Sequence, residues 1–239
     1  MTMREQWEDQ AGPWLAWARA PGHDSFWRHH REQFDTLLPP PGALTLDIGC
    51  GEGRLSRHLT SRGHRVIGVD ASPTLIAAAR AADPSIAVVR ADAAALPLTD
   101  ACADLAIAFM SLQDVDAIQA AIREVARVLK PGGRLCMAIV HPLNSAGTFA
   151  SLAADAPFVI QGSYLDSFTY SDAVERDGFS MVFHSAHRPL QSYVAALEEA
   201  GFLIESLREP STPEAIVTSD SSRRWLRVPL FLHLRCLRP

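Results

Sequence analysis

Cysteine is scarce in this 239-residue chain, and its four cysteines stand far apart. They lie in apolar or glycine-rich stretches without a CxxC pair, at Cys50, Cys102, Cys136 and Cys236. Disulfide frameworks and structural zinc sites need closely and regularly spaced cysteines, so the sequence predicts neither. Unpaired cysteines suit a reducing compartment, and we expect the protein in the cytoplasm.

The chain also lacks an excess of positive charge and long apolar runs. Its formal net charge is -5 and its pI is about 6.0. Nucleic acids and anionic membranes attract basic surfaces, so we expect neither as the main partner. The polar start MTMREQWEDQ is unlike a signal peptide, and no run approaches the length of a bilayer span. We expect a monomer or homodimer that acts on a small molecule.

What the chain does have is a regular alternation of strand and helix patterns. Short apolar runs predict strands at 43–49, 64–70, 86–92, 103–110 and 134–140. Helical patterns intervene at 53–63, 72–82 and 114–130. Nearly continuous apolar strands separated by helices indicate a doubly wound, mostly parallel α/β sheet with both faces covered by helices.

Two segments differ from this core. Residues 1–41 are helical in pattern and rich in tryptophan, and Pro13 and the pair Pro21-Gly22 divide them into short helices. We interpret this stretch as a helical cap with an aromatic core. Residues 141–187 interrupt the alternation with proline, glycine, serine and aromatics. We interpret them as an inserted substrate lid.

The last part of the chain completes the sheet. A helix is predicted at 189–201, followed by strands at 202–207 and 228–237. Two closing strands after the fifth indicate an antiparallel C-terminal hairpin on a seven-stranded sheet. We therefore predict a single domain over 1–239, made of a cap (1–41), a core (42–140), a lid (141–187) and a C-terminal helix and hairpin (188–239).

A glycine-rich loop, LDIGCGEG (46–53), follows the first strand and opens the first helix. Its glycines let the backbone approach a ligand closely. Arg54 stands where the G-x-G-x-x-G dinucleotide fingerprint requires its last glycine. Asp47 precedes the first glycine by two residues, where a carboxylate would repel a pyrophosphate and suits a ligand that carries an amino group.

Acidic residues also end the next two strands. Asp70 follows Gly49 by 21 residues, at a position where an acid can hold both hydroxyls of a ribose. Asp92 ends the third strand at the same edge of the sheet, where it can accept a hydrogen bond from an adenine amino group. The loop and these acids together predict a nucleoside site.

The segments LDIGCGEGR, GVDASP, RADAAALPL and RVLKPGGRL occur in this order over roughly residues 44–140. They resemble the ordered motifs of class I S-adenosylmethionine-dependent methyltransferases, in the small-molecule branch (type 11-like). The resemblance implies a Rossmann-like methyltransferase fold, S-adenosylmethionine as cofactor and S-adenosylhomocysteine as product. It also implies methyl transfer to an oxygen, nitrogen or activated carbon atom of a small molecule, as in natural-product metabolism.

The resemblance further implies how the cofactor is held at its methionine end. The backbone of Gly49, Cys50 and Gly51 would lie under the methionine part. Asp47 would lie near its amino group. Two residues after the fourth strand would contact the same end through their backbone, namely Met110 and Ser111.

The adenosine end is assigned in the same way. Asp70 would bind the ribose. Asp92 and the Ala93 amide would hold the adenine, with Ala71 or Leu75 against its face. These positions all follow strands whose carboxyl ends share one edge of the sheet.

Methyl transfer needs alignment and exclusion of water, and a base only where the nucleophile must lose a proton. His141 directly follows the fifth strand, and its neutral form can take a proton near pH 7. A strand-end histidine bonded to backbone is an equally good interpretation. His23 and Asp24 resemble a spot where related enzymes cover the cofactor, although Asp24 also suits helix capping. We interpret Asp114 as a helix cap.

The lid offers three further candidates, Tyr164, Tyr170 and His184. They would line a substrate pocket or pack the lid itself. His184 and His187 suggest a metal pair with His141, but no carboxylate or cysteine completes a recognisable spacing, so we predict no metal.

Missing motifs narrow the substrate. Residues 109–112 read FMSL, unlike the Asn/Asp-Pro-Pro-Tyr of adenine and glutamine methyltransferases, and no Pro-Cys pair offers a nucleophile for cytosine. A methyltransferase for tRNA or protein would show a basic groove at the cofactor edge. A non-catalytic cofactor-binding scaffold would keep the same acids. A nicotinamide-dependent oxidoreductase is disfavoured by Arg54.

Overall fold

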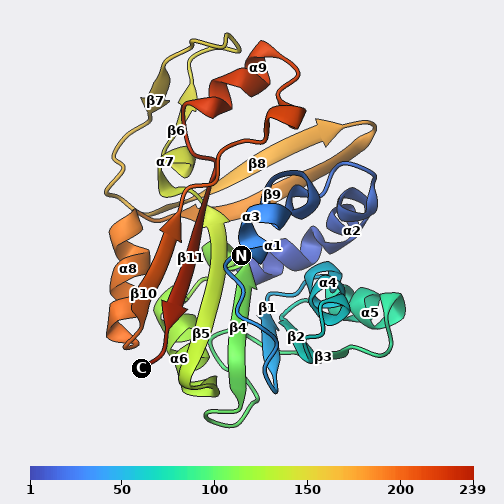
Figure 1. Ribbon diagram of the computed structural model, residues 1–239. Helices are drawn as coiled ribbons and strands as arrows, with labels where there is room; N and C mark the ends of the chain where they lie inside the picture. Colours follow the sequence, from blue (N-terminus) through green and yellow to red (C-terminus); the bar gives the residue numbers. More distant parts are fainter.

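The centre of the computed structural model, which describes residues 1–239, is a seven-stranded sheet (Figure 1). The strands lie in the order β10-β11-β5-β4-β1-β2-β3. Only β11 runs against the others, because it pairs antiparallel with both β5 and β10. The bounds are Thr45–Ile48 (β1), Val66–Asp70 (β2), Ala87–Arg90 (β3), Ala103–Phe109 (β4), Leu129–Val140 (β5), Leu203–Arg208 (β10) and Phe231–Leu237 (β11). The predicted doubly wound, mostly parallel sheet with antiparallel C-terminal strands is confirmed.

Four helices cover the faces of this sheet. They are Arg54–Ser61 (α4), Pro73–Ala82 (α5), Ile118–Val128 (α6) and Leu190–Glu199 (α8). Ser72 caps α5 as expected, since its hydroxyl accepts a hydrogen bond from the Leu75 amide at 3.0 Å. None of the helices combines the length and apolar character that a bilayer span requires.

The start of α6 differs from the prediction. The helix was expected from residue 114, but Leu112–Asp114 form a short 3₁₀ turn (η2) and α6 begins at Ile118. Asp114 therefore caps no helix. Its carboxylate bonds instead to Ser185, at 2.6 Å, on a segment 71 residues further along the chain.

The N-terminal residues form the helices Met3–Asp9 (α1), Ala11–Arg19 (α2) and Arg31–Asp35 (α3), with a π-helical turn over Phe26–His30 (η1). The prediction that Pro13 divides two helices is wrong, because it lies in the first turn of α2. Proline is tolerated there, since the amide that it lacks would have no partner in the helix. The division falls at Gln10.

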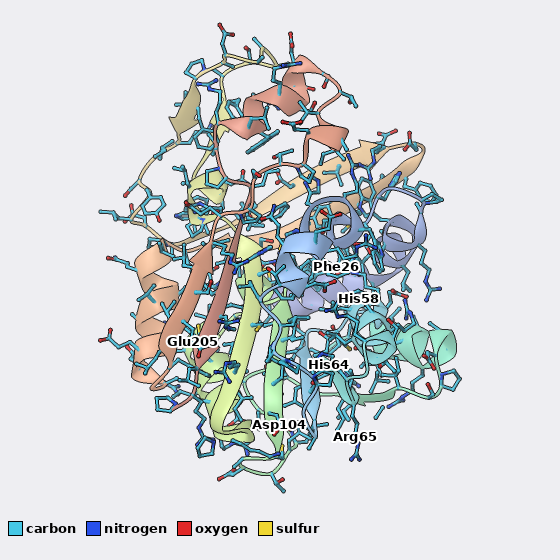
Figure 2. All side chains as sticks on the ribbon, viewed as in Figure 1. Phe26, His58, His64, Arg65, Asp104 and Glu205 are labelled. Carbon is cyan, nitrogen blue, oxygen red and sulfur yellow. The ribbon has the colours of Figure 1, made fainter.

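This segment belongs to the core of the protein. Phe26 and Phe34 are fully buried and pack with Leu55, Leu105 and other residues of α4 and the sheet. Figure 2 labels Phe26 and His58, whose rings lie 5.1 Å apart where the N-terminal segment meets α4. Burying each phenylalanine stabilises the fold by roughly 1.5–3 kcal/mol. The aromatic residues of the segment thus include true core positions.

Residues 141–187 contain more structure than the word lid suggests. Pro142–Ser145 form α7, and the short strands Gly147–Phe149 (β6) and Phe158–Ile160 (β7) pair with each other. Phe168–Arg176 (β8) and Phe179–His187 (β9) form a long hairpin that extends over the N-terminal helices (Figure 1). The hairpin is fastened there, since the Trp7 indole donates to the His184 carbonyl at 3.0 Å.

The two C-terminal strands are separated by a long connection. It contains the short helix Asp220–Arg223 (α9) between two 3₁₀ turns, Glu214–Ile216 (η3) and Arg224–Leu226 (η4). The connection packs on β6, where the rings of Phe149 and Trp225 lie 4.9 Å apart. The last strand begins at Phe231 rather than at the expected residue 228.

Candidate cofactor and substrate site

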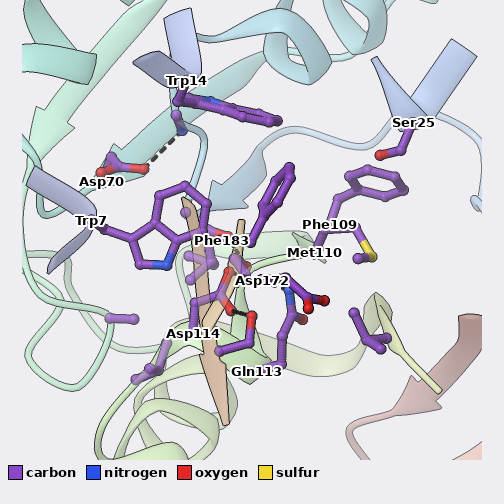
Figure 3. Close-up of a pocket in the computed structure, with 18 of the residues that line it drawn as sticks. Trp7, Trp14, Ser25, Asp70, Phe109, Met110, Gln113, Asp114, Asp172 and Phe183 are labelled. Carbon is purple, nitrogen blue, oxygen red and sulfur yellow. Dashed lines mark hydrogen bonds between the residues drawn. The ribbon is translucent and has the colours of Figure 1, made fainter. Parts of the chain in front are cut away.

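A cavity of about 940 Å³ opens where β1, β2 and β4 end. Open α/β sheets bind ligands at this carboxyl edge of their strands. The N-terminal helices and the β8-β9 hairpin close it from above with the aromatic rings of Trp7, Trp14 and Phe183 (Figure 3). Their ring centroids lie 6.1–6.3 Å apart in edge-to-face arrangement. The cavity is at the upper end of the range for small-molecule sites, roughly 300–1,000 Å³.

All ten residues predicted to contact the cofactor line this one cavity. They are Asp47, Gly49, Cys50, Gly51, Asp70, Ala71, Asp92, Ala93, Met110 and Ser111. They come from segments up to 64 residues apart, and the family resemblance together with the strand-end argument placed them at one site. The cavity continues beyond them toward the hairpin and α7.

The glycine loop closes tightly against the end of β4. Gly49 has φ +73°, and a Cβ added there would lie 2.4 Å from the Ser111 Cβ. The Ser111 hydroxyl donates to the Ile48 carbonyl at 2.7 Å and fixes this contact. Met110 has φ +52°, an uncommon conformation for a bulky residue. Such strain tends to gather at functional sites, and here it lies on the cavity wall.

Asp70 holds the loop and also faces the cavity. Its two carboxylate oxygens accept hydrogen bonds from the Gly51 and Ser72 amides, each at 2.8 Å. Each oxygen keeps a lone pair for another donor, such as a ribose hydroxyl. Burial raises the pKa of Asp70, with the two amide bonds opposing it. Figure 3 shows this carboxylate beside Trp14 at one end of the cavity.

Asp47 is almost completely buried and forms no ion pair. The Ser56 hydroxyl donates to it at 2.6 Å, while the nearest guanidinium in the loop, that of Arg54, pairs with Asp24 at 2.7 Å. Burial, with the nearby charge of Asp70, raises the pKa of Asp47 to about 6. A cationic group in the cavity would favour the ionised carboxylate.

Asp92 is the most exposed of the predicted cofactor acids. Its side chain lies 3.6 Å from the Arg4 guanidinium of α1 and accepts a hydrogen bond from the Ala94 amide at 2.9 Å. Helix α1 therefore borders the expected adenine end. Cys50 is a neutral part of the cavity wall, because burial raises the pKa of its thiol well above the usual value.

His141 does not line the cavity, so the expectation that it acts as a base needs correction. Its Nδ1 accepts a hydrogen bond from the Leu143 amide at 3.0 Å, and its Nε2 lies 2.9 Å from a Glu209 carboxylate oxygen. Burial lowers its pKa, and Glu209 opposes this effect. Both ring nitrogens are engaged in contacts that hold α7 and the segment after β10. These contacts support a structural role for His141.

The cap candidates separate from each other. His23 lines the cavity, and its Nε2 lies 3.0 Å from an Asp177 carboxylate oxygen in the turn of the hairpin. Asp24 does not line it. Asp24 accepts a hydrogen bond from the Phe26 amide at 2.8 Å and pairs with Arg54, so its role is helix capping and an ion pair. The prediction that Asp24 is a catalytic residue is therefore wrong.

Of the lid candidates, only Tyr170 lines the cavity. The Tyr164 hydroxyl accepts a hydrogen bond from the Leu190 amide at 3.1 Å and helps to start α8. His184 bonds to Ser171 on the neighbouring strand, with Nδ1 and Oγ 2.8 Å apart. Both side chains therefore have structural roles outside the cavity, which corrects the expectation for them.

Asp114 is the site residue that sequence reasoning missed. It lines the cavity, where its carboxylate accepts hydrogen bonds from the Ser185 hydroxyl at 2.6 Å and the Gln113 amide at 3.2 Å. Burial raises its pKa to about 8, against the lowering effects of Ser185 and of the Arg188 charge. No signal in the sequence pointed to it, because the helical pattern over 114–130 begins at Asp114 and indicated a helix cap.

Comparison with known proteins gives a consistent picture. Residues 46–137 match the profile of a family described as a methyltransferase domain. An uncharacterized methyltransferase of Mycobacterium tuberculosis is 40% identical over 104 residues, 44% of this chain and 42% of that protein. A demethylmenaquinone methyltransferase of Beutenbergia cavernae is 35% identical over 117 residues, 49% of this chain and 48% of that protein. The chain spans less than half the length of these curated relatives.

Solved structures extend the likeness to most of the chain. An S-adenosylmethionine-dependent methyltransferase from Mesorhizobium loti, 28% identical, gives a TM-score of 0.71 and covers 87% of this chain and 96% of that one. A geranyl diphosphate C-methyltransferase from Streptomyces coelicolor, 14% identical with a TM-score of 0.57, covers 94% and 88% and shares the fold. The matched family segment carries the glycine loop and the strand-end acids. Residues 46–137 therefore resemble the methyltransferase-domain family, and most of the chain is similar in fold to S-adenosylmethionine-dependent methyltransferases.

Proposed function

We propose that this protein transfers the methyl group of S-adenosylmethionine to an oxygen, nitrogen or activated carbon atom of a small molecule. One observation carries the proposal: all ten expected cofactor positions line a single cavity. This cavity continues beneath the aromatic rings of Trp7, Trp14 and Phe183. Relatives named for demethylmenaquinone and for ubiquinone/menaquinone biosynthesis support a small-molecule substrate.

The residues of the cavity fit the cofactor. Asp47 is a buried carboxylate without a cation, which suits the amino group of the methionine part. Gly51 leaves space beside the Trp14 indole, since an added Cβ would meet only its Nε1, at 3.6 Å, and Gly49 lets the loop pack directly against Ser111. Asp70 presents a carboxylate to ribose hydroxyls at the other end of the loop. When bound, S-adenosylmethionine supplies an electrophilic methyl group on a sulfonium.

The protein contributes position and a dry site. Trp7, Trp14 and Phe183 close the cavity over the glycine loop and exclude water from it. Holding a nucleophile in line with the methyl group can lower the barrier by roughly 7–11 kcal/mol at best. Because the lid is fastened to the N-terminal helices, substrate access depends on both segments.

The charge of the cavity favours a small molecule over tRNA. Seven acidic residues line it, against two arginines, and each arginine is paired with an acid, Arg4 with Asp92 and Arg54 with Asp24. A phosphate backbone requires the opposite balance. Cytoplasmic location is part of the proposal and is supported by the four free cysteines.

Calorimetry tests the proposal directly. We expect micromolar binding of S-adenosylmethionine and S-adenosylhomocysteine, and no binding of NAD. Asp70→Asn should weaken binding about 10- to 100-fold, because a hydrogen bond to a charged group contributes roughly 1.5–3 kcal/mol. Asp166→Asn, in an exposed loop away from the cavity, is the matched control. A folded protein that binds neither compound would overturn the assignment, and binding without transfer to any acceptor would favour the scaffold.

A further inference from the structure

A second polar group lies in the cavity beyond the cofactor positions. Asp114 and Gln113 come from η2, and Ser185 and Tyr170 come from the two strands of the hairpin. In Figure 3, Asp114 and Gln113 lie across the cavity from Asp70, with Phe183 between them. This acceptor cluster, defined as Asp114, Gln113, Ser185 and Tyr170, takes no part in the binding of the cofactor described above.

Gln113 has an unpaired acceptor. Its side chain is only 3% exposed, and its amide nitrogen donates to Asp114 at 3.2 Å. That bond leaves the amide oxygen, which is buried and has no hydrogen-bond partner. Buried polar atoms are almost always paired in folded proteins, so an orphaned acceptor on a cavity wall points to a donor on the ligand.

The charges around the cluster disfavour an anionic ligand. Asp114, Asp116 and Asp172 line this part of the cavity, and both arginines of the cavity are paired with other acids. A carboxylate or phosphate would meet like charge here. The nearby guanidinium of Arg188 is not among the residues that line the cavity, and it donates hydrogen bonds to the Gln113 and Val115 carbonyls. A neutral or cationic ligand with hydrogen-bond donors fits.

The walls beside the cluster indicate the shape of the ligand. Trp7, Phe168, Tyr170 and Phe183 line the cavity around Asp114. Aromatic side chains prefer offset or edge-to-face contacts with other rings, and they also favour cations over their faces. A flat aromatic ring that carries a hydrogen-bond donor would pack against these walls and donate to Asp114 or to the Gln113 amide oxygen.

We propose that the acceptor cluster binds an aromatic hydroxyl or amine compound, and that Asp114 accepts the proton from its oxygen or nitrogen during methyl transfer. This inference rests on the proposed function and deepens it. The lone pair of the nucleophile forms the new bond to the methyl carbon, and the carbon–sulfur bond breaks with its electron pair left on sulfur. The proton of the nucleophile passes to a carboxylate oxygen of Asp114.

The environment of Asp114 suits this task. Ser185 and Gln113 each donate to one carboxylate oxygen and so fix its orientation. Burial raises the pKa of this carboxyl to about 8, which makes its ionised form a stronger base than an exposed aspartate. General bases work best when their pKa lies near the working pH.

Binding of four probes that share one ring tests the ligand class. The probes are 4-ethylphenol, 4-ethylaniline, 4-ethylbenzoate and 4-ethylanisole, titrated by calorimetry into protein loaded with S-adenosylhomocysteine. We expect the phenol or the aniline to bind at least tenfold more tightly than the carboxylate and the ether. Equal binding of all four, tighter binding of the carboxylate, or binding of none would overturn the inference.

Variants test the role of Asp114. Asp114→Asn should leave the affinity for S-adenosylhomocysteine within about twofold and lower transfer of labelled methyl to the better probe by about 100-fold or more. The wild-type rate should rise with pH and level off above about 8, and the variant should lose this rise. Gln113→Met, which keeps Asp114, should weaken binding of the phenol or aniline but not of the ether. Asp166→Asn serves as control.

The outcomes separate the two proposals. If the wild-type protein does not bind S-adenosylhomocysteine, the proposed function and this inference are both overturned. Normal binding of that compound, with an Asp114→Asn variant that keeps the wild-type rate and pH profile, would overturn the inference alone.

Discussion

Asp47 and Asp70 are buried carboxylates on neighbouring strands, and their hydrogen bonds give them different tasks. Each carboxylate oxygen of Asp70 accepts a hydrogen bond from a backbone amide, and these two bonds fix the conformation of the loop. Asp47 has only the Ser56 hydroxyl, and burial raises its pKa to about 6. One acid therefore organises the protein even without ligand, whereas the other requires a cation to be fully ionised at mildly acidic pH.

Cofactor affinity should consequently depend on pH. The cationic amino group of S-adenosylmethionine favours ionised Asp47, so its dissociation constant should rise as the pH falls below about 6, by up to tenfold per unit. Calorimetry between pH 5 and 7.5 measures this change. Asp47→Asn should bind weakly with a much flatter profile. A wild-type affinity that stays constant over this range would show that Asp47 does not face the amino group.

At the scale of elements, the predictable part of the site is the part built by strand ends. Asp47 lies near the end of β1, Asp70 ends β2 and Asp92 follows β3, and the parallel sheet brings such positions to one edge without any long-range information. Asp114 and Ser185 could not be paired from the sequence, because their contact joins a 3₁₀ turn to a hairpin 71 residues away. The prediction that His141 acts as a base was wrong for a different reason. Its place after a strand predicts the edge of the sheet at which it lies, but not the direction in which its ring points.

The junction of β1 and β4 provides a test at this scale. Gly49→Ala should lower the free energy of unfolding by about 2–4 kcal/mol, the sum of the left-handed backbone cost and the clash with Ser111. Gly132→Ala is the matched control, with φ +80° and open space around its Cα, and should cost only about 1–2 kcal/mol. Urea denaturation measures both variants. Equal losses of unfolding free energy in the two variants would mean that Ser111 moves aside without cost.

At the scale of the whole molecule, the N-terminal segment is joined to the C-terminal strand through a buried histidine pair. His30 Nδ1 lies 2.8 Å from His233 Nε2, and both side chains are at most 1% exposed. The pair connects η1 to β11, which are 203 residues apart in sequence and adjacent in the sheet-and-helix core. The chain closes on itself here, so the cap, and with it the roof of the cavity, depends on this contact.

Acid should loosen this closure. Burial lowers the pKa of His233 to about 4, with Arg208 adding to the effect, and burial also lowers the pKa of His30 well below its usual value. Histidines that the fold keeps neutral stabilise it fully above the unfolded pKa of about 6.5, and this stability is lost as the pH falls toward 4. For one such proton the loss is on the order of 3 kcal/mol.

Urea unfolding at pH 7.5 and 4.5 tests this expectation. The free energy of unfolding should drop more between these two pH values for the wild type than for the His30→Phe/His233→Leu double variant. Equal drops would place the acid sensitivity elsewhere, whereas a smaller drop in the double variant would show that protonation of this pair destabilises the fold.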